Sequence, residues 1–501
     1  MSVLQNMMWL LDVRTVLLCV VVLLVLRWFL GRPKNLPPGP WGFPLIGSVP
    51  AIVREIRRGV EPHDLFIRYA AKYGPVFRLQ IFNKTAVVLN DYTSVKEAFQ
   101  HPQLQDRPEM LIQKILSDGV ATISGQPWVE LRRFCLTALR SFGVGKTSFE
   151  EKIGTEAEEL VKEMSAFNGK SFNPKHLLGN AVSNVICSVV FGKRYEYTDK
   201  EFERLLFLLA RNFELLGSGG AINYFPELRH VPFLPTSEIV SNFKEIREFL
   251  LKVIDKHRAA FDADDLRDFI DVYLVEVKNN QAKDDIGEEH GYLTDDNLVG
   301  TIENIFAAGS ETTATTLQWA LLYMAVYPEI QQRVQTEIDA VVGRNRLPRM
   351  ADKPELNFTR AVIWEVQRLS LIVPFGVPHA AASDTQFHGF MIPKGAFLVP
   401  NLWAVARDPK VWSDPDQFQP ERFLNDKGEA VQADELIPFS VGRRSCIGEH
   451  LAKVELLIFF SFFLHQFTFK KPDNSSPLSL KGKNGITYSP EEFDICAMKR
   501  E

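Results

Sequence analysis

The longest helical pattern in the sequence covers residues 292–327, and it constrains the fold more than any other segment. Thr294 is a typical N-cap residue, and the acidic residues Asp295 and Asp296 that follow it suit the first turn of a helix. Pro328 ends the pattern, because proline cannot continue a helix. At about 1.5 Å of rise per residue, such a helix is roughly 50 Å long. The chain must therefore form a domain large enough for this helix to cross.

The other sequence patterns predict a mainly α protein with a small β region, an α+β class. Helical periodicity dominates from Ser94 onward, and its clearest stretches are residues 149–167, 180–191, 201–216 and 237–261. Apolar residues alternate over residues 75–89, which predicts a small hairpin, and a second short strand region covers residues 385–398. With 501 residues and 46% hydrophobic content, the chain can bury a large core.

The N-terminal segment over residues 9–30 is mostly apolar and predicts a membrane anchor. Its uninterrupted apolar run, residues 16–26, is shorter than the ~20 residues that a bilayer span needs. However, Arg14 and Arg27 lie near the ends of the run, where long side chains can reach the interface. A cleaved signal peptide is the alternative, but no small-x-small cleavage site follows the run. We therefore expect a transmembrane signal anchor.

Positive charge gathers after this segment, at Arg27, Arg32 and Lys34, which predicts that the rest of the chain lies in the cytosol. Residues 33–40 are rich in proline and predict a stiff tether. The predicted organisation is an anchor over residues 1–30, a Pro-rich hinge over residues 31–40 and a catalytic domain over residues 41–501.

Composition excludes several classes of protein. The formal net charge of -5 gives no sign of a nucleic-acid partner. The cysteines are scattered and form no C-x-x-C pair, which argues for a reducing compartment and against a zinc ribbon or a disulfide scaffold; they are Cys19, Cys135, Cys187, Cys446 and Cys496. No glycine-rich loop stands in the context of a nucleotide fold. If the protein carries out redox chemistry, its electrons therefore come from another protein.

Cys446 stands in the sequence F-S-V-G-R-R-S-C-I-G, before an apolar segment over residues 451–463 that predicts a helix. The positive end of that helix and the neighbouring arginines favour a thiolate, so we expect a lowered pKa for Cys446. The glycines on either side, Gly442 and Gly448, indicate that something bulky approaches the backbone. A thiolate held in this way is a metal ligand or a nucleophile, and a buried, inert cysteine is the plainer alternative.

The middle of the long helical pattern, A-A-G-S-E-T-T, places Gly309 beside an acid–alcohol pair, Glu311 and Thr312. In one interpretation, Gly309 marks a close helix crossing and the Thr312 hydroxyl is satisfied within the helix. In the other, the helix opens locally and gives a small ligand room. Thr312 would then donate a hydrogen bond to that ligand, and Glu311 would help to relay protons.

Two further pairs have helical spacing. Glu365 and Arg368 share one helix face and are usually a solvated surface pair, unless Arg422 in the downstream sequence P-E-R-F completes a buried charge network. Trp128 and Arg132 place an indole and a guanidinium on one helix face. That arrangement suits an anionic, planar group, although most such pairs are surface packing.

Together and in this order, these motifs resemble those of the haem-thiolate monooxygenases, the cytochrome P-450 superfamily. They are W-x-x-x-R, A-G-x-E-T, E-x-x-R, P-E-R-F and F-x-x-G-x-R-x-C-x-G. The resemblance covers essentially the whole chain and is greatest to microsomal family 2 members, which oxidise steroids, fatty acids and xenobiotics. It implies the cytochrome P-450 fold, with a single-pass anchor in the endoplasmic reticulum membrane.

By this resemblance, Cys446 is the axial thiolate ligand of the iron in haem b, and Thr312 and Glu311 are the catalytic residues of the distal side. The cofactor-binding residues implied are Cys446, Trp128, Arg132, His379, Arg444, Arg107, Phe439, Gly442, Gly448 and Ala308. Glu365, Arg368 and Arg422 are implied to be structural. Substrate contacts are implied for Ile305, Phe306, Val373, Phe375 and Ile486, and for segments over residues 110–123 and 213–233.

The implied reaction inserts one atom of O2 into a lipophilic substrate, by hydroxylation or epoxidation. Electrons are expected from NADPH through NADPH–cytochrome P-450 reductase, with cytochrome b5 as a further partner. The reductase is expected to dock on basic residues, for which a solvated basic face is the plainer alternative; these are Arg132, Arg133, Arg140, Lys146 and Arg443. The alternative function is a thiolate-haem isomerase that rearranges peroxides without a reductase.

Overall fold

The computed structural model of the chain describes residues 15–20, 22–23, 35–110, 118–141, 147–218, 236–285, 292–473 and 475–500. The predicted anchor over residues 1–30 therefore lies for the most part outside the described residues. Within those ranges, no helix combines the length and the apolar character that a membrane crossing requires.

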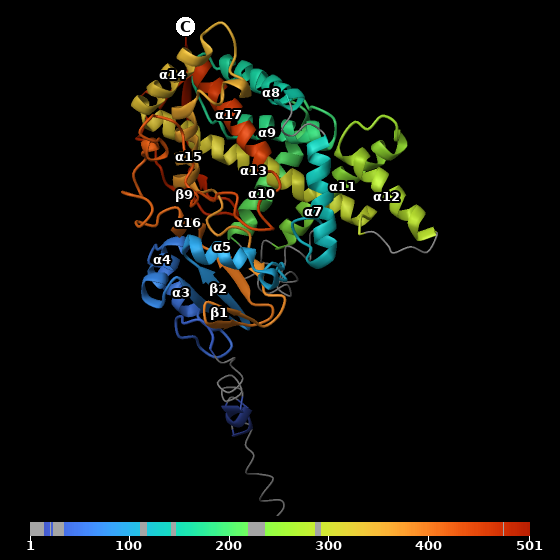
Figure 1. The fold of residues 1–501 in the computed structure, drawn as a ribbon, viewed down its shortest axis with the longest axis vertical. Coiled ribbons are helices and arrows are strands. Elements are labelled where there is room, and N and C mark those ends of the chain that lie inside the picture. Colours follow the sequence, from blue (N-terminus) through green and yellow to red (C-terminus); the bar gives the residue numbers. More distant parts are fainter. Residues whose placement is uncertain are drawn as a thin grey trace, which may run out of the picture. The chain divides into compact units, whose positions relative to one another are not determined.

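The chain forms two compact units. The first comprises Met1–Pro108 and Pro378–Asn401, and the second comprises Glu109–Val377 and Leu402–Glu501. Helices dominate the described residues and the sheets are small, in agreement with the predicted mainly α class with a small β region (Figure 1).

The first unit contains a four-stranded sheet in the order β1-β2-β7-β4. Its strands are β1 (Val76–Ile81), β2 (Lys84–Leu89), β4 (His379–Ala380) and β7 (Phe397–Pro400). β1 and β2 form the predicted hairpin, with Val76 opposite Leu89. β7 runs parallel to β2 and antiparallel to β4. A separate hairpin joins β5 (Thr385–Phe387) to β6 (Phe390–Ile392).

Three α-helices accompany this sheet within the first unit. α3 (Val49–Ile56) and α4 (Pro62–Tyr73) precede β1, and α5 (Tyr92–Gln100) follows β2. α3 and α4 lie outside the predicted helical region, which starts at Ser94. Both are short, and each has proline in its first turn, where a missing N–H leaves no hydrogen bond unmade.

The second unit is a helical assembly around α13 (Asp295–Val326). Its other helices are α7 (Gly125–Ser141), α8 (Thr147–Ala166), α9 (Lys175–Val190), α10 (Lys200–Ser218), α11 (Thr236–Ala259), α12 (Phe269–Asp285), α14 (Pro328–Val342), α15 (Asn357–Ser370), α16 (Leu402–Val405) and α17 (Glu449–Gln466). Two small sheets, ordered β3-β11-β8 and β10-β9, complete the unit. Their strands are β3 (Ser171–Phe172), β8 (Phe467–Lys470), β9 (Gly482–Lys483), β10 (Ser489–Pro490) and β11 (Ile495–Lys499). The helical stretches predicted over residues 149–167, 180–191, 201–216 and 237–261 are all present, although α9 begins at Lys175 rather than at residue 180.

α13 has the predicted ends. The Thr294 side chain accepts a hydrogen bond of 3.3 Å from the N–H of Asn297, and Pro328 begins the next helix. α13 contacts α9, α15 and α17, which surround it in Figure 1. The apolar side chains of these helices join those of α13 in one continuous core. The helix is continuous from end to end, so the predicted local opening in its middle is not present. The Thr312 hydroxyl instead donates to the carbonyl of Ala308 within the helix, at 2.7 Å.

Gly309 marks the close crossing of α13 and α9, as in the plainer of the two sequence interpretations. A Cβ at this position would lie 2.6 Å from Cδ1 of Ile186 on α9. Ile186 is 2% exposed, so its side chain has little room to move away. The absence of a side chain at Gly309 therefore allows the two helices to approach closely.

The Gly309→Ala variant should be less stable than the native protein. Inserting a methyl group into a filled core costs about 1–3 kcal/mol, which outweighs the gain of about 1 kcal/mol for alanine over glycine in a helix. In an Ile186→Ala background the same substitution should become stabilising, because the methyl group then has space. Urea unfolding of the four proteins measures both effects. A destabilisation by Gly309→Ala that persists in the Ile186→Ala background would show that the crossing is not limited by these two side chains.

Candidate active site

Cys446 lies in the turn that leads into α17, as predicted. Its N–H donates to the carbonyl of Phe439 at 3.0 Å, which closes the turn. Gly442 within the turn has φ +81°, a conformation that glycine adopts without strain. Gly448 is the N-cap residue of α17. The cysteine sulfur therefore stands at the N-terminal end of a helix.

The surroundings of the sulfur act on its pKa in opposite directions. Burial raises the pKa of Cys446 most strongly, whereas the N–H groups of Gly448 and Glu449, which donate to the sulfur, lower it. The Glu449 carboxylate raises the pKa further, and the Arg132 guanidinium lowers it. The net direction is upward, so the predicted lowering is wrong for the polypeptide alone, because burial was underestimated. The side chain is nevertheless exposed, which indicates a sulfur with one open side.

Trp128, Arg132 and Arg444 meet beside the Cys446 turn. Trp128 and Arg132 share α7, and Arg132 Nη2 donates to the carbonyl of Ser445 at 2.7 Å. The Arg444 guanidinium lies 4.1 Å from the centre of the Trp128 ring, and its Nη2 donates to the carbonyl of Ile123 at 2.8 Å. Burial lowers the pKa of Arg132. The structure thus brings together three of the predicted cofactor-binding residues and the sulfur.

This arrangement fits a planar, anionic group with a metal at its centre. The sulfur offers a soft ligand atom on its open side, and two guanidinium groups beside an indole suit carboxylate substituents. Among the described residues, a Cβ on Gly448 would have the Cys446 sulfur as its one neighbour within 4 Å, at an ordinary 3.8 Å. Packing within the protein therefore does not require glycine there, which is consistent with room left for a bound group.

His379 and Arg107, two further predicted cofactor-binding residues, belong to the first unit. Arg107 Nη1 donates to the carbonyl of Pro378 at 2.9 Å. Arg107 therefore lies beside the residue that directly precedes His379. His379 is 2% exposed, and its ring stacks on Phe99 with the ring centres 3.7 Å apart. Its Nδ1 lies 3.1 Å from the carbonyl oxygen of Leu104, to which it donates.

One side of α13 carries Ile305, Ala308 and Thr312. These residues recur at spacings of three and four, so they share a helix face, and Ala308 on this face is exposed. Phe306 lies on the opposite side, is 1% exposed, and has its ring centre 5.6 Å from that of Phe191. The predicted substrate contact at Phe306 is therefore wrong. Phe306 follows Ile305 by one residue, and this difference of about 100° around the helix directs its side chain into the core.

Glu311 does not share the side of Thr312. It lines a cavity of about 740 Å³ together with Lys175 of α9 and residues of α10 and of the β9–β10 hairpin. Burial raises the pKa of Glu311, while Lys175 and a hydrogen bond from Thr315 lower it less strongly. The acid and the alcohol of the predicted pair therefore face different surroundings, since adjacent helical residues differ by about 100° in direction.

The other predicted substrate-contact residues are Val373, Phe375 and Ile486, and all are half-buried. Val373 accepts a hydrogen bond of 3.0 Å from Gly376 in the turn after α15, and Ile486 donates to the carbonyl of Phe213. Residues 111–117 and 219–235 lie outside the described residues, and with them half of the predicted substrate segment over residues 110–123 and most of the segment over residues 213–233.

Glu365, Arg368 and Arg422 form the predicted buried network. Arg368 donates to both carboxylate oxygens of Glu365, at 2.7 Å and 2.8 Å, and both side chains are 0% exposed. Arg422 Nε donates to Glu365 at 3.1 Å. Arg368 also donates to the carbonyls of Ala406 and Pro415. The network therefore connects α15 to the irregular segment before the Cys446 turn.

Glu455 on α17 is a buried titratable residue that the sequence analysis did not single out. Its side chain is in the core, and burial raises its pKa to about 8, although a hydrogen bond from Thr313 of α13 lowers it. This carboxyl group therefore connects the helix after Cys446 to the helix of Thr312. An acidic residue within the apolar sequence over residues 451–463 was the available signal.

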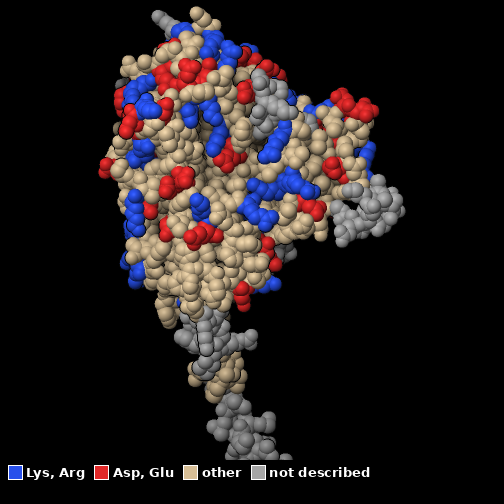
Figure 2. All heavy atoms as spheres, viewed as in Figure 1, with Lys and Arg blue, Asp and Glu red and all other residues tan. Residues whose placement is uncertain are grey.

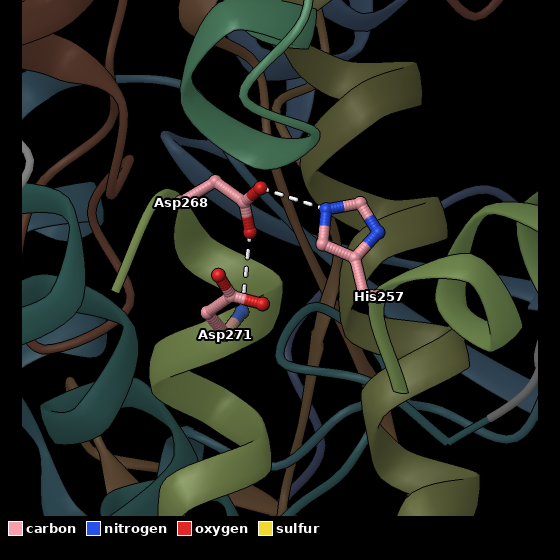
Figure 3. Close-up of side chains that lie close together, drawn as sticks. All are labelled: His257, Asp268 and Asp271. Atoms are coloured by element: carbon pink, nitrogen blue, oxygen red, sulfur yellow. Dashed lines mark hydrogen bonds and ion pairs between the residues drawn. The ribbon is translucent and has the colours of Figure 1, made fainter. Parts of the chain in front are cut away.

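A second cluster of titratable groups joins α11 to α12 (Figure 3). His257 Nδ1 lies 2.8 Å from the carbonyl of Val253 and Nε2 lies 2.7 Å from Asp268. A carbonyl cannot donate, so Nδ1 carries a proton, and a second proton on Nε2 completes the bond to Asp268. Asp271 accepts hydrogen bonds from Arg267 with both carboxylate oxygens, and its backbone N–H donates to Asp268 at 3.1 Å (Figure 3). The cluster is therefore two ion pairs, with an imidazolium at His257.

The predicted reductase-docking residues are only partly available at the surface. Arg133, Arg140 and Arg443 are exposed, whereas Arg132 is engaged with Ser445. Lys146 lies outside the described residues. On the face in Figure 2, basic side chains form small groups separated by acidic ones.

Comparison with known proteins identifies the relatives of the chain. The sequence model of the Cytochrome P450 family matches residues 37–497. Cytochrome P450 2J2 from Homo sapiens is 41% identical over 493 residues, covering 97% of this chain and 96% of the relative. Cytochrome P450 2J3 from Rattus norvegicus is 41% identical over 500 residues, covering 98% of this chain and 97% of the relative. Cytochrome P450 2U1 from Bos taurus is 37% identical over 510 residues, covering 97% of this chain and 93% of the relative.

The His257→Gln variant should lose more thermal stability at pH about 6 than at pH about 8.5. Burial lowers the pKa of His257, but the bond to Asp268 outweighs burial and raises it. The stabilisation is therefore complete below the unfolded pKa of about 6.5 and is lost as the pH rises through the folded pKa. Melting temperatures of the native protein and the variant across this range measure the difference.

His388→Gln is the matched control, because the His388–Glu97 pair has the same 2.7 Å separation but is more exposed. Its effect should be small at both pH values, since exposed ion pairs contribute about 1 kcal/mol or less. A loss for His257→Gln that is equal at both pH values, or larger at the higher one, would contradict an imidazolium at this position.

Proposed function

Because the chain belongs to the cytochrome P450 family, we propose that this monooxygenase oxidises a lipophilic substrate at the side of α13 that carries Thr312. The reaction is R–H + O2 + two electrons + two protons → R–OH + H2O, with epoxidation where the substrate presents an alkene. The cofactor of the family is haem whose iron is bound by a cysteine thiolate. With that ligand, haem supplies the activation and cleavage of O2.

Cys446 is the proposed haem ligand, and its surroundings carry the proposal. The sulfur has an open side and receives N–H groups from the start of α17, and Arg132 lies close to it. These donors favour the thiolate that a metal requires. Burial of the polypeptide opposes the thiolate, so we expect metal binding and loss of the thiol proton to occur together.

The proposed roles of the neighbouring residues follow from their charge and position. Arg132 and Arg444 would hold the carboxylate substituents of the cofactor, together with Trp128 of α7, whose ring lies against Arg444. His379 and Arg107 are proposed for the same role from the first unit. Phe439, Gly442, Gly448 and Ala308 are proposed to contact the macrocycle.

Thr312 and Glu311 are proposed to deliver protons from different sides of α13. The Thr312 hydroxyl donates to the carbonyl of Ala308, and rotation about its Cβ–Oγ bond would turn the proton toward a group bound at the exposed side of the helix. Glu311 keeps its proton to a higher pH than an exposed glutamate, because burial raises its pKa. Its position beside Lys175 in a solvent-open cavity supports a role in taking up protons from water.

The substrate is proposed to be a steroid, a fatty acid or a foreign lipophile, because Ile305, Val373, Phe375 and Ile486 offer half-buried apolar surface. Glu365, Arg368 and Arg422 are proposed to be structural, since they fix the segment before the Cys446 turn. Residues 1–30 are proposed as a single-pass anchor in the endoplasmic reticulum membrane and residues 31–40 as a hinge. The catalytic domain, residues 41–501, is placed in the cytosol.

Electrons are proposed to come from NADPH through NADPH–cytochrome P-450 reductase, with cytochrome b5 as a further partner. The exposed residues Arg133, Arg140 and Arg443 are the proposed basic contacts. Turnover that requires neither NADPH nor reductase would contradict monooxygenation and would indicate a thiolate-haem isomerase.

The Cys446→Ala variant should lose its haem. The native protein, reduced and treated with carbon monoxide, should show the Soret shift of a thiolate-ligated haem. Purified Cys446→Ala should contain little haem and show no such shift, because no other sulfur replaces the ligand. Cys496→Ala is the control, since Cys496 is a buried cysteine of β11. An unchanged carbon monoxide spectrum for Cys446→Ala would disprove the assignment.

The Thr312→Ala variant should keep its haem but should be uncoupled, so that it consumes NADPH without forming the corresponding amount of product. Loss of the hydroxyl removes a proton donor beside the reacting oxygen, and general acid catalysis is typically worth about 10²–10⁴-fold. NADPH consumption, peroxide release and product formation, measured together with reconstituted reductase, give the coupling. Thr336→Ala on α14 is the matched control, because its hydroxyl makes the same bond to the carbonyl four residues earlier. Equal coupling in native protein and Thr312→Ala would refute the distal role.

A further inference from the structure

The cavity that contains Glu311 lies on a different side of α13 from Thr312. It has a volume of about 740 Å³, and α9, α10, α13 and the β9–β10 hairpin contribute to its lining. This volume is within the roughly 300–1,000 Å³ that is typical of small-molecule sites. Its α13 lining includes Ala307, Glu311 and Gln318, which share one helix face because spacings of four and seven residues return to the same side. Thr312 does not line the cavity, which is therefore separate from the proposed position of oxidation.

Gln318 places an unpaired amide in this cavity. Its side chain is 6% exposed, yet no hydrogen bond joins its carboxamide to any residue that the structure describes. A carboxamide offers two N–H donors and an acceptor oxygen, and leaving such groups unpaired in the interior costs stability. Gln335 on α14 shows the usual arrangement at 7% exposure, because its Nε2 donates to the carbonyl of Phe467 at 3.0 Å and to the Thr468 hydroxyl at 3.1 Å. The Gln318 amide, by contrast, has its hydrogen-bonding capacity left for a bound molecule.

Two further groups add hydrogen-bonding capacity inside the cavity. Thr487 of the hairpin is 3% exposed and lines the same space. Glu311 precedes Gln318 by seven residues, about 10 Å along the helix axis. Burial raises the pKa of Glu311, so its carboxyl group can donate through O–H as well as accept. An amide, a hydroxyl and a carboxyl group suit the hydroxyl or carbonyl groups of a ligand.

The α9 side of the cavity carries a lysine that can bind an anion. Lys175 is the first residue of α9, where the helix adds positive partial charge. Its side chain is exposed and forms no ion pair within the described part of the chain, but it is close enough to Glu311 to act on the pKa of that residue. On the hairpin side, Lys483 is accompanied by Glu491 and Glu492 in the lining. An anion is therefore attracted to the α9 side.

α10 gives the cavity an apolar edge. Leu206, Phe207 and Phe213 line it from this helix. The Phe207 side chain is 56% exposed, so its ring offers apolar surface at the edge of the cavity. Small-molecule sites combine such apolar surface with a few polar groups that fix the orientation of the ligand.

We propose that this cavity is a second ligand site, which binds an organic carboxylate that carries hydroxyl or carbonyl groups and an apolar substituent. Lys175 and the start of α9 hold the carboxylate. Gln318 and Thr487 bind the hydroxyl or carbonyl groups, and the apolar substituent packs on Phe207. Sugar-acid conjugates of aromatic alcohols combine these groups. The site goes beyond the proposed oxidation and does not depend on it, because Thr312 and the haem contribute nothing to it.

The probes are 4-nitrophenyl β-D-glucuronide and 4-nitrophenyl β-D-glucoside, which differ only in a carboxylate in place of a CH2OH group. Binding to the full-length haem protein is measured by isothermal titration calorimetry, with 4-phenylimidazole present to occupy the haem. The native protein should bind the glucuronide about 2- to 5-fold more tightly, as expected for an exposed ion pair. Lys175→Gln should bind the two probes equally. Lys200→Gln is the matched control and should keep the preference, since Lys200 lines the same cavity but is paired with Glu203 at 2.8 Å.

Gln318→Met replaces the amide by an apolar side chain of similar length. It should weaken the binding of both probes by about 2- to 12-fold, the effect of one neutral hydrogen bond. Its melting temperature should not fall, because the amide has no partner to lose. Gln335→Met is the matched control at nearly the same burial. It should leave both affinities unchanged and lower the melting temperature, since it removes the bonds to Phe467 and Thr468.

Each result has an outcome that would overturn the proposal. No saturable binding to the native protein, or binding that disappears when 4-phenylimidazole is added, would show that there is no second site. Equal affinities of the native protein for the two probes would overturn the role of Lys175, and native affinity in Gln318→Met would overturn that of Gln318. Calorimetry needs no thiolate-ligated haem, so it gives a result even where the spectrum with carbon monoxide contradicts the proposed function.

Discussion

The close contact between Gly309 of α13 and Ile186 of α9 sets the rotation of α13, and the placement of the residues on that helix depends on it. A helix that packs through a glycine cannot turn about its axis without losing the contact. Ile305, Ala308 and Thr312 therefore share one side, Phe306 is in the core, and Glu311 faces the cavity with Lys175. The glycine serves the packing between helices, and the Thr312 hydroxyl is satisfied by Ala308 without an opening.

The Cys446 turn depends on groups from three separate parts of the second unit. Its sulfur receives N–H groups from the start of α17, its backbone is held by Arg132 of α7, and Arg444 within it binds the carbonyl of Ile123. The Glu365 network holds the irregular segment that precedes the turn. Removing one member of a buried charge network leaves the others uncompensated, at a cost of about 3–5 kcal/mol. Such a network specifies the position of a segment that has no regular secondary structure of its own.

Buried titratable side chains in this protein are accommodated in two contrasting ways. His257 and Asp268 form an ion pair in which each charge compensates the other. Glu455 has no such compensation from its hydrogen bond to Thr313, and its pKa of about 8 leaves it largely protonated at neutral pH. A neutral carboxyl group can both donate and accept, so it can connect α17 to α13 without a buried charge. Glu311 is intermediate, with a raised pKa and a lysine nearby.

Local chemistry in the sequence was sufficient for much of this description. The Thr294 cap, the end of α13 before Pro328, the β1–β2 hairpin and the Glu365–Arg368 pair depend on residues close together in the chain, and the structure contains them all. Family membership was likewise evident from short motifs. Tertiary structure alone decided the side of α13 on which each residue lies, the raised pKa of Cys446 and the cavity that Gln318 shares with Lys175. These properties arise from segments far apart in sequence, because burial and helix rotation depend on packing partners that local patterns do not identify.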